Sequence, residues 1–267
     1  MRNNWHFNTI TVLFCSLLFS LVANASATDA ETSLMQAVYK GKISGWKVEL
    51  KRSLIRYPDG QYQLRSSAEN LFASIEEKSL FELKEGRLVP QEYTYERSIF
   101  GKKSLEKIAY DWTKNQAFYT RSDRERNNTE HALSTYLMDP ALYQIAIQAD
   151  LAKGQDFLHY RYIKRKYIDE YQLHIQDNES IIIDDKKYDA KVVLRKDPDS
   201  DKSTKVWVVP KLHYMIAKIQ HTDKDGDEFS ITLANYSADT NQLEQFYQSF
   251  TNNLAAQPAL KPAATSL

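Results

Sequence analysis

Hydrophobic and polar residues alternate with a period of two along most of the chain. In the run from Trp46 to Leu54, apolar residues alternate with charged residues and a serine, which is typical of a strand buried on one face. Pro58-Asp59-Gly60 is a tight-turn sequence, and alternation resumes from Tyr62 to Ala68, so the two runs predict a hairpin. Further predicted strands lie at 35–39, 75–83, 87–97, 105–112, 118–121, 157–166, 168–176, 180–184, 188–195 and 228–236.

The clearest single stretch runs from Lys205 to His221. Val206 to Val209 are β-branched or aromatic, Pro210 removes a backbone donor, and alternation resumes at Tyr214. The stretch therefore predicts a strand, a corner marked by Pro210 and a second strand. The stretch contains no pattern that indicates a catalytic nucleophile or a metal site.

Helical signals are few. Asp139 is a good N-cap, Pro140 suits the first helical position and Gly154 is a stop, so we expect a helix from Asp139 to Ala152. A weaker helix is expected from Thr240 to Phe250. Residues 122–135 are polar and aperiodic and predict a long exposed loop, and the Pro/Ala tail from Ala255 is expected to be disordered.

These elements predict a mostly β fold: a single antiparallel curved sheet, or an open β-barrel, of about ten strands. We expect the central helix against the concave face or mouth of the sheet, and a further helix at the C-terminus. The length and the 42% hydrophobic content suit one sizeable folded domain.

The N-terminal residues 1–27 read as a secretory signal peptide. The apolar run from Ile10 to Val22 is shorter than the roughly 20 residues of a membrane span, and small residues at 23–27 offer cleavage after Ala25 or Ala27. Cleavage removes Cys15, the only cysteine, so no disulfide is expected. The prediction is a periplasmic protein with no transmembrane segment in the mature chain. Its β-rich domain covers 28–239, and 240–267 hold the C-terminal helix and tail.

Charge and motifs argue against several classes of function. The chain has 35 basic and 35 acidic residues, so broad capture of nucleic acid is not expected. The acidic clusters 197–201 and 223–227 lack the spacing of a calcium loop and predict hairpin turns instead. No two histidines stand at zinc-enzyme spacing, and no Gly-x-Ser-x-Gly motif occurs. We therefore predict no catalytic residues, no metal and no cofactor.

Four short motifs carry a family resemblance: 59–64 (Asp-Gly-Gln-Tyr-Gln-Leu), 86–93 (Gly-Arg-Leu-Val-Pro-Gln-Glu-Tyr), 110–112 (Tyr-Asp-Trp) and 207–214 (Trp-Val-Val-Pro-Lys-Leu-His-Tyr). On these the chain resembles the exported Gram-negative family numbered 3108 among domains of unknown function, over about residues 35–237. It departs from the family pattern at Pro140 to Leu142 and at Val209. The resemblance implies a periplasmic β-rich domain and supplies no catalytic residue.

Large aromatic residues are the candidate ligand-lining positions: Trp46, Trp112, Trp207 and Tyr214. They either pack in the core or line an apolar groove on a curved sheet. The first functional hypothesis is a non-catalytic periplasmic protein that binds a lipid or another apolar or amphipathic envelope ligand in the concave face. The alternative is an envelope-assembly scaffold whose sheet edge or tail contacts another envelope protein. A third is an enzyme whose residues meet only in three dimensions.

Overall fold

The computed structural model describes residues 31–43, 46–134, 136–197 and 200–251. The predicted signal peptide, Cys15 and the tail from Ala255 lie outside these ranges, and the predicted domain boundaries stay predictions. In the described part, one sheet of 15 strands runs in the order β8-β7-β6-β5-β4-β3-β2-β1-β15-β14-β13-β12-β11-β10-β9, with β8 and β9 as its edges. The mostly β, open-sheet prediction is confirmed, but the sheet has more strands than the expected ten.

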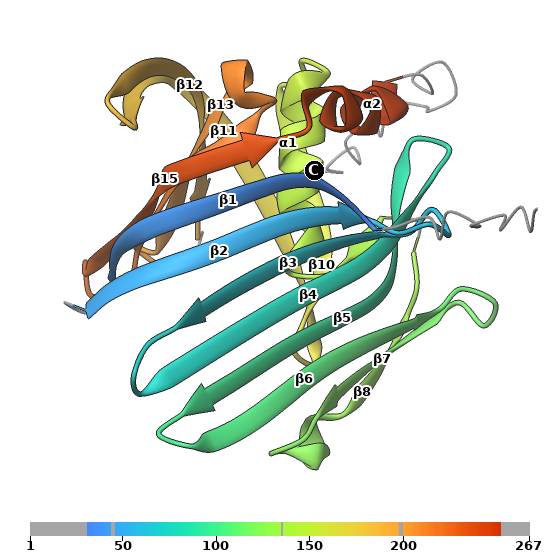
Figure 1. Cartoon of the computed structure of the whole chain (residues 1–267). Helices are drawn as coiled ribbons and strands as arrows, with labels where there is room; N and C mark the ends of the chain where they lie inside the picture. The colour runs from blue at the N-terminus through green and yellow to red at the C-terminus, as the bar shows by residue number, and fades with distance from the viewer. Residues whose placement is uncertain (1–30, 44–45, 135, 198–199, 252–267) are drawn as a thin grey trace, which may run out of the picture. The chain divides into compact units, whose positions relative to one another are not determined.

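The strands follow one another as two meanders that meet side by side (Figure 1). The first consists of β1 (Thr32–Ile43), β2 (Trp46–Arg56), β3 (Tyr62–Glu69), β4 (Ala73–Lys84), β5 (Arg87–Ile99), β6 (Lys102–Asp111), β7 (Gln116–Arg121) and β8 (Thr129–Ala132). The second consists of β10 (Phe157–Lys164), β11 (Tyr167–Ile183), β12 (Lys186–Lys196), β13 (Ser203–Val209), β14 (Met215–Thr222) and β15 (Glu228–Ala238). Antiparallel pairing of β1 with β15 joins them, and the short β9 (Leu137–Met138) pairs in parallel with β10.

Cross-strand register shows why the alternation predicts these strands. A row of directly opposed residues crosses β2 to β7, and every member is buried: Leu54, Leu64, Ser79, Tyr93, Ile108 and Tyr119. Their neighbours in sequence point to the opposite side of the sheet. We call the side of this buried row the inner face and the opposite side the outer face.

Two helices cover the inner face: α1 (Leu142–Ala152) and α2 (Thr240–Thr251). Helix α1 is apolar almost all round, as expected for a helix enclosed by its surroundings. A polar contact reaches it from β2, another from β4 reaches the turn before it, and tyrosine rings reach it from β10 and β11. Helix α2 places Phe246 against Tyr62 and Phe81, with ring centroids 5.1 and 6.4 Å apart. Both predicted helices are confirmed.

Three details differ from the sequence prediction. The helix predicted from Asp139 begins at Leu142, because residues 139–141 form a turn before it. The predicted loop 122–135 contains the 3-10 helix η1 (Glu125–Asn127) and strand β8, so that part of the prediction is wrong. A sheet-edge strand can be polar, because only one of its sides pairs and little of it is buried. The runs 168–176 and 180–184 form one strand, β11, with an irregularity between Gln176 and Glu179.

The strand, corner and strand around Pro210 are confirmed. Strand β13 ends at Val209, the 3-10 helix η2 (Pro210–Leu212) turns the chain, and β14 begins at Met215. Between η2 and β14, His213 and Tyr214 both have left-handed backbone conformations, with φ of 53° and 56°. This corner brings the residue before β14 next to α1, where Gln148 Nε2 donates a 2.9 Å hydrogen bond to the Tyr214 carbonyl.

Candidate functional site

A cluster of buried polar side chains connects α1 to the inner face of the sheet. The Ser79 hydroxyl of β4 donates a 2.6 Å hydrogen bond to Asp139 Oδ2. Arg52 of β2 donates through Nη1 to Gln144 Oε1 at 2.7 Å and through Nε to Ser66 Oγ at 3.0 Å. Hydrogen bonds that involve a charged group are stronger than neutral ones, so these contacts fix α1 on the strands beneath it.

Burial changes the ionisation of this cluster. It raises the pKa of Asp139 to about 7 and raises the pKa of Glu77, which accepts a 2.8 Å hydrogen bond from the Tyr93 hydroxyl. Burial and the nearby Asp139 carboxylate raise the pKa of Tyr110 well above its usual value. Among the described residues, the buried Tyr110 hydroxyl has no hydrogen-bond partner. Perturbed carboxylates often mark functional sites.

The Asp139 carboxylate is nevertheless poorly placed for chemistry on a substrate. Its side chain is fully buried, and Oδ1 accepts hydrogen bonds from the backbone N–H groups of Ala141 and Leu142 at 2.9 and 2.8 Å. Together with Ser79, the protein itself supplies three donors. The arrangement therefore caps α1 and fixes it to β4, which is a structural task.

Tyrosine rings fill the other side of α1. Tyr143 stacks on Tyr162 with ring centroids 5.1 Å apart and meets the edge of Tyr171 at 5.5 Å. The Arg195 guanidinium lies 3.6 Å from the Tyr171 ring centroid. Tyr160 donates a 2.9 Å hydrogen bond to Asp150 on the same helix. Helix α1 and these rings thus occupy inner-face space that the ligand hypothesis assigned to a bound molecule.

A notch of about 310 Å³ lies where the end of α1, η2 and α2 meet. We call it the α1–α2 notch. Its lining residues are Ala152, Pro210, His213, Tyr214, Glu244, Tyr247 and Gln248. The His213 ring places Nδ1 3.2 Å from the Tyr236 hydroxyl and Nε2 3.8 Å from Glu244 Oε1. The notch therefore combines tyrosine and proline surfaces with one polar pair.

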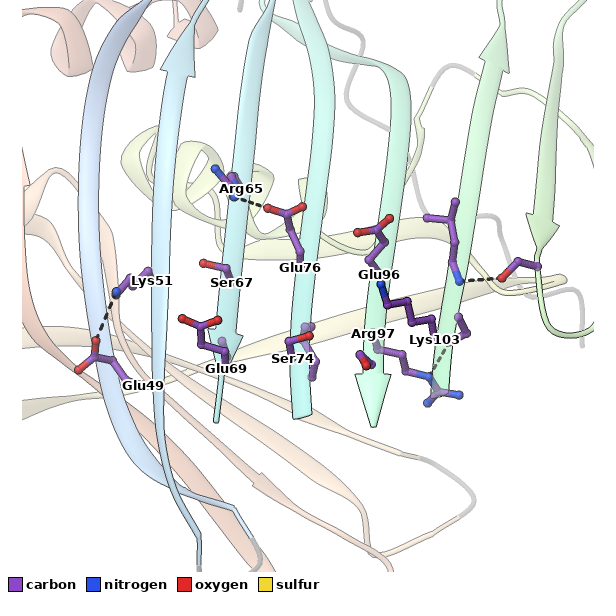
Figure 2. Close-up of a pocket in the computed structure, with 16 residues that line it drawn as sticks. Glu49, Lys51, Arg65, Ser67, Glu69, Ser74, Glu76, Glu96, Arg97 and Lys103 are labelled. Atoms are coloured by element: carbon purple, nitrogen blue, oxygen red, sulfur yellow. Dashed lines mark hydrogen bonds and ion pairs between the residues drawn. The ribbon is translucent and has the colours of Figure 1, made fainter. Parts of the chain in front are cut away.

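A larger depression of about 640 Å³ lies over strands β2 to β6 (Figure 2). Its charges pair with one another: Arg65 with Glu76, and Lys51 with Glu49. The hydrogen bond from Lys78 and then that from Arg65 lower the pKa of Glu76. Because its lining is mixed in sign and two of its acidic residues are paired with basic neighbours, this depression does not select one class of ligand.

The structure describes three of the four side chains predicted to line a ligand site and does not bring these three together at the α1–α2 notch. Trp46 begins β2 opposite Ile43, and its side chain is outside the described part. Trp112 follows β6, donates a 2.8 Å hydrogen bond to the Pro90 carbonyl and stacks on Tyr110. Neither Trp112 nor Trp207 lines the α1–α2 notch, whereas Tyr214 does.

Trp207 is 5% exposed and is covered by charged side chains. Its Nε1 donates a 2.8 Å hydrogen bond to Glu179 Oε2, and the Lys205 and Lys218 ammonium groups lie 4.8 and 4.4 Å from the ring. Cation–π contacts and the Glu179 bond hold the indole in place. Sequence reasoning did not identify Pro210, His213, Glu244 or Tyr247 as one group, because they meet only through the packing of α2 against η2.

Comparison with known proteins places the chain in a family. No curated protein matches it. Two solved structures, each 11% identical in sequence, are similar to this chain. One is a candidate lipoprotein from Parabacteroides distasonis, with a TM-score of 0.30 and an alignment that covers 77% of this chain and 96% of that one. The other is a candidate outer membrane lipoprotein-sorting protein domain from Vibrio parahaemolyticus, with a TM-score of 0.22 and coverage of 82% of this chain and 91% of that one. Within the described residues, no helix is long and apolar enough to cross a membrane. A family profile matches residues 38–234, so the chain belongs to the family described as protein of unknown function (DUF3108).

Proposed function

We propose that this protein is an exported, non-catalytic periplasmic protein and that it binds the apolar part of an amphipathic envelope ligand in the α1–α2 notch. Export is supported by the signal-like residues 1–27. Because α1 packs on the inner face, we place the ligand at the end of this helix instead of across the concave sheet. Tyr214, one of the residues selected from sequence, lines this notch.

The observation that carries the proposal is the backbone beside the notch. Two consecutive non-glycine residues, His213 and Tyr214, adopt left-handed conformations. Such conformations are unfavourable by about 1–2 kcal/mol per residue and are concentrated at ligand clamps and active sites. The bond from Gln148 to the Tyr214 carbonyl helps to hold this conformation. This backbone conformation places His213 and Tyr214 at the notch.

The shape and chemistry of the notch suit part of an amphipathic molecule. Its volume of about 310 Å³ is at the small end of the range for ligand pockets, roughly 300–1,000 Å³. Tyr214, Tyr247 and Pro210 offer apolar surface, and His213 with Glu244 offers polar groups for a headgroup. Since the carboxylate of Asp139 is buried and satisfied by the protein, we assign no catalytic role.

The alternative function, an envelope-assembly scaffold, needs a contact surface instead of a pocket. It is favoured by the two edge strands of the sheet, β8 and β9, because an edge strand has backbone groups that can pair with another chain. The two functions differ in what the purified protein carries, because a scaffold needs no small ligand.

The test is native mass spectrometry and lipid extraction of the protein purified from its own periplasmic fraction. N-terminal sequencing of the same sample is expected to begin at Ser26 or Thr28. The wild type is expected to carry a ligand that Tyr214→Asp loses. Aspartate tolerates the left-handed region better than tyrosine, so this variant keeps its fold.

Tyr167→Asp is the matched control, because Tyr167 is an exposed tyrosine of β11 outside the notch. This variant is expected to retain the ligand. A wild type without any ligand, or equal ligand in all three proteins, overturns the binding proposal in favour of the scaffold. A retained N-terminal Met1 overturns export.

A further inference from the structure

Two neighbouring hairpin tips expose a contiguous group of large apolar side chains. Leu71 and Phe72 lie in the β3–β4 turn, and Ile99 and Phe100 lie at the β5–β6 turn; we call these four the tip patch. Leu71 is 89% exposed and Phe100 is 76% exposed, and Phe72 and Ile99 are 45% and 44% exposed. Single exposed apolar residues are ordinary, but a cluster of this kind marks a contact site.

Hydrogen bonds and a ring contact fix the conformation of the tip patch. The Phe100 backbone N–H donates a 2.8 Å hydrogen bond to the Phe72 carbonyl, which joins the two turns. The two rings lie 5.5 Å apart. Asn70 Oδ1 accepts hydrogen bonds from the N–H groups of Phe72 and Ala73 at 2.9 and 2.8 Å, so the β3–β4 turn has a fixed conformation. The apolar side chains are therefore presented by rigid turns.

Within this chain, the exposed Phe100 ring gains only the contact with the neighbouring Phe72 ring among the ring contacts of the described residues. Phe100 and Gly101 form a two-residue hairpin loop in which both φ angles are positive, 48° and 77°. Such loops strongly favour Asn-Gly, and a bulky residue in the first position is disfavoured. Here the disfavoured residue also points its ring into solvent. The ring is therefore best explained by a contact outside this chain.

Charge around the tip patch identifies the kind of contact. Lys102 and Lys103 begin β6 directly after the Phe100-Gly101 loop, are exposed, and form no ion pair with any residue that the structure describes. At the adjacent β1–β2 hairpin, Lys42 and Lys47 are opposed in register and exposed. Glu69, the last residue of β3, is an acidic residue next to the β3–β4 turn. Figure 1 shows the β1–β2, β3–β4 and β5–β6 hairpins following one another at the same end of the strands.

We propose that the tip patch inserts into the surface of an anionic lipid bilayer. Apolar and aromatic side chains enter the headgroup and acyl boundary, while the flanking lysines contact lipid phosphates. The acidic β14–β15 tip, with Asp223, Asp225 and Asp227, lies on the other side of β1 and restricts the contact to the β1–β6 hairpins. A stable protein partner generally needs about 20–30 residues a side, and four tip residues beside a charged outer face do not provide that.

The test is co-sedimentation of the purified exported protein with vesicles of phosphatidylglycerol and phosphatidylethanolamine. We expect binding that weakens as salt rises and that is weaker on vesicles of phosphatidylcholine alone. The variant Leu71→Ser/Phe100→Asn is expected to bind at least tenfold more weakly. It keeps the fold, because the second substitution gives this turn the Asn-Gly sequence that two-residue hairpin loops favour.

Phe157→Asn is the matched control: Phe157 is an exposed phenylalanine at the start of β10, away from the tips, and this variant should bind as the wild type does. Lys102→Gln/Lys103→Gln is expected to reduce both the binding and its salt dependence. No vesicle binding by the wild type, or equal binding by the tip variant, overturns the proposal. Light scattering that shows a wild-type dimer and a monomeric tip variant, without lipid binding, assigns the patch to self-association instead. Because the notch is unchanged in these variants, this test is independent of the proposed ligand.

Discussion

The Ser79 hydroxyl donates a 2.6 Å hydrogen bond to the Asp139 carboxylate, and this contact joins the centre of β4 to the turn that begins α1. The two residues are sixty positions apart, and both are fully buried. Asp139 accepts two further bonds from backbone N–H groups. The same side chain thus caps the helix and attaches it to the sheet.

Asp139→Asn is expected to change how stability depends on pH. Burial raises the pKa of Asp139 from its usual value to about 7, so between about pH 4 and 7 the native protein holds a proton there that the unfolded chain has lost. Native protonation makes stability fall as pH rises through this window. Asparagine cannot ionise but can still accept the two backbone bonds. Urea unfolding at pH 8 should show that Asp139→Asn is more stable than the wild type by on the order of 1–3 kcal/mol. At pH 4 this difference should shrink or reverse.

Ser79→Ala is the companion variant, because it removes the hydroxyl donor and leaves the carboxylate in place. It should lower the free energy of unfolding by about 1–3 kcal/mol at pH 8. If the Asp139→Asn difference is the same at pH 4 and pH 8, Asp139 does not titrate in this range.

Arg52→Ala is expected to lower the free energy of unfolding by about 2–4 kcal/mol. The change leaves Gln144 and Ser66 without their donor in a buried setting and removes the cation that lowers the pKa of Glu77. Lys51→Ala is the matched control, since the exposed Lys51 is the preceding residue of β2 and points to the outer face; its effect should stay within about 0.5 kcal/mol.

A double-mutant cycle with Gln144→Ala separates the bond from general packing. The coupling between Arg52 and Gln144 should be about 1 kcal/mol or more. Zero coupling, with both single variants destabilised, would show that the helix does not depend on this bond.

The fold could be predicted from sequence because its strands are half-buried. Alternation identifies a strand wherever one face packs and the other is wet, as in the row through Leu54 and Leu64. It does not identify β8, whose residues Thr129 to Ala132 pair only with β7 and bury one histidine. Asp139 and Pro140 predict the existence of α1, because capping is local chemistry, but they place its start about two residues too early: the helix begins at Leu142, and Asp139 bonds the N–H groups of Ala141 and Leu142.

The candidate sites could be predicted only in part. Tyr214 was selected as a large aromatic, but the notch around it forms where α2 packs, and no local pattern encodes that contact. Arg52 could be recognised from sequence, because it lies at an alternating position between Leu50 and Leu54 where an apolar residue is expected. A charge in such a column predicts a buried partner. The identity of that partner, Gln144, depends on tertiary packing across 92 positions.

Trp207→Ala is expected to lower the free energy of unfolding by about 3–5 kcal/mol, because the indole is 5% exposed. Trp207→Phe keeps most of the buried ring but leaves Glu179 without the Nε1 donor, so a smaller loss of about 1–2 kcal/mol is expected. Phe157→Ala, at an exposed aromatic, should change stability by less than about 0.5 kcal/mol. A loss below about 1 kcal/mol for Trp207→Ala in urea unfolding would mean that the ring adds little to the core.

Gly41→Ala tests the seam between the two meanders. Gly41 lies in β1, opposed to Val48 of β2 and Ile231 of β15. A Cβ at this position would overlap the Ser230 backbone carbonyl and lie 3.0 Å from the Ile231 Cα. Backbone atoms cannot move aside as a flexible side chain can, so β15 would have to separate locally from β1.

This pairing is the contact by which the two meanders share one sheet, so Gly41→Ala should lower the free energy of unfolding by at least about 3 kcal/mol, a large part of the stability of a single domain. Gly60→Ala is the matched control: Gly60 has a φ of 86° and open space around it, so the change should add only backbone strain of about 1–2 kcal/mol. Urea unfolding of both variants, with hydrogen exchange of the β1 and β15 amides, makes the comparison. Equal losses in the two variants, with β15 amides still protected in Gly41→Ala, would show that the seam can absorb a methyl group and that the close approach does not constrain residue 41.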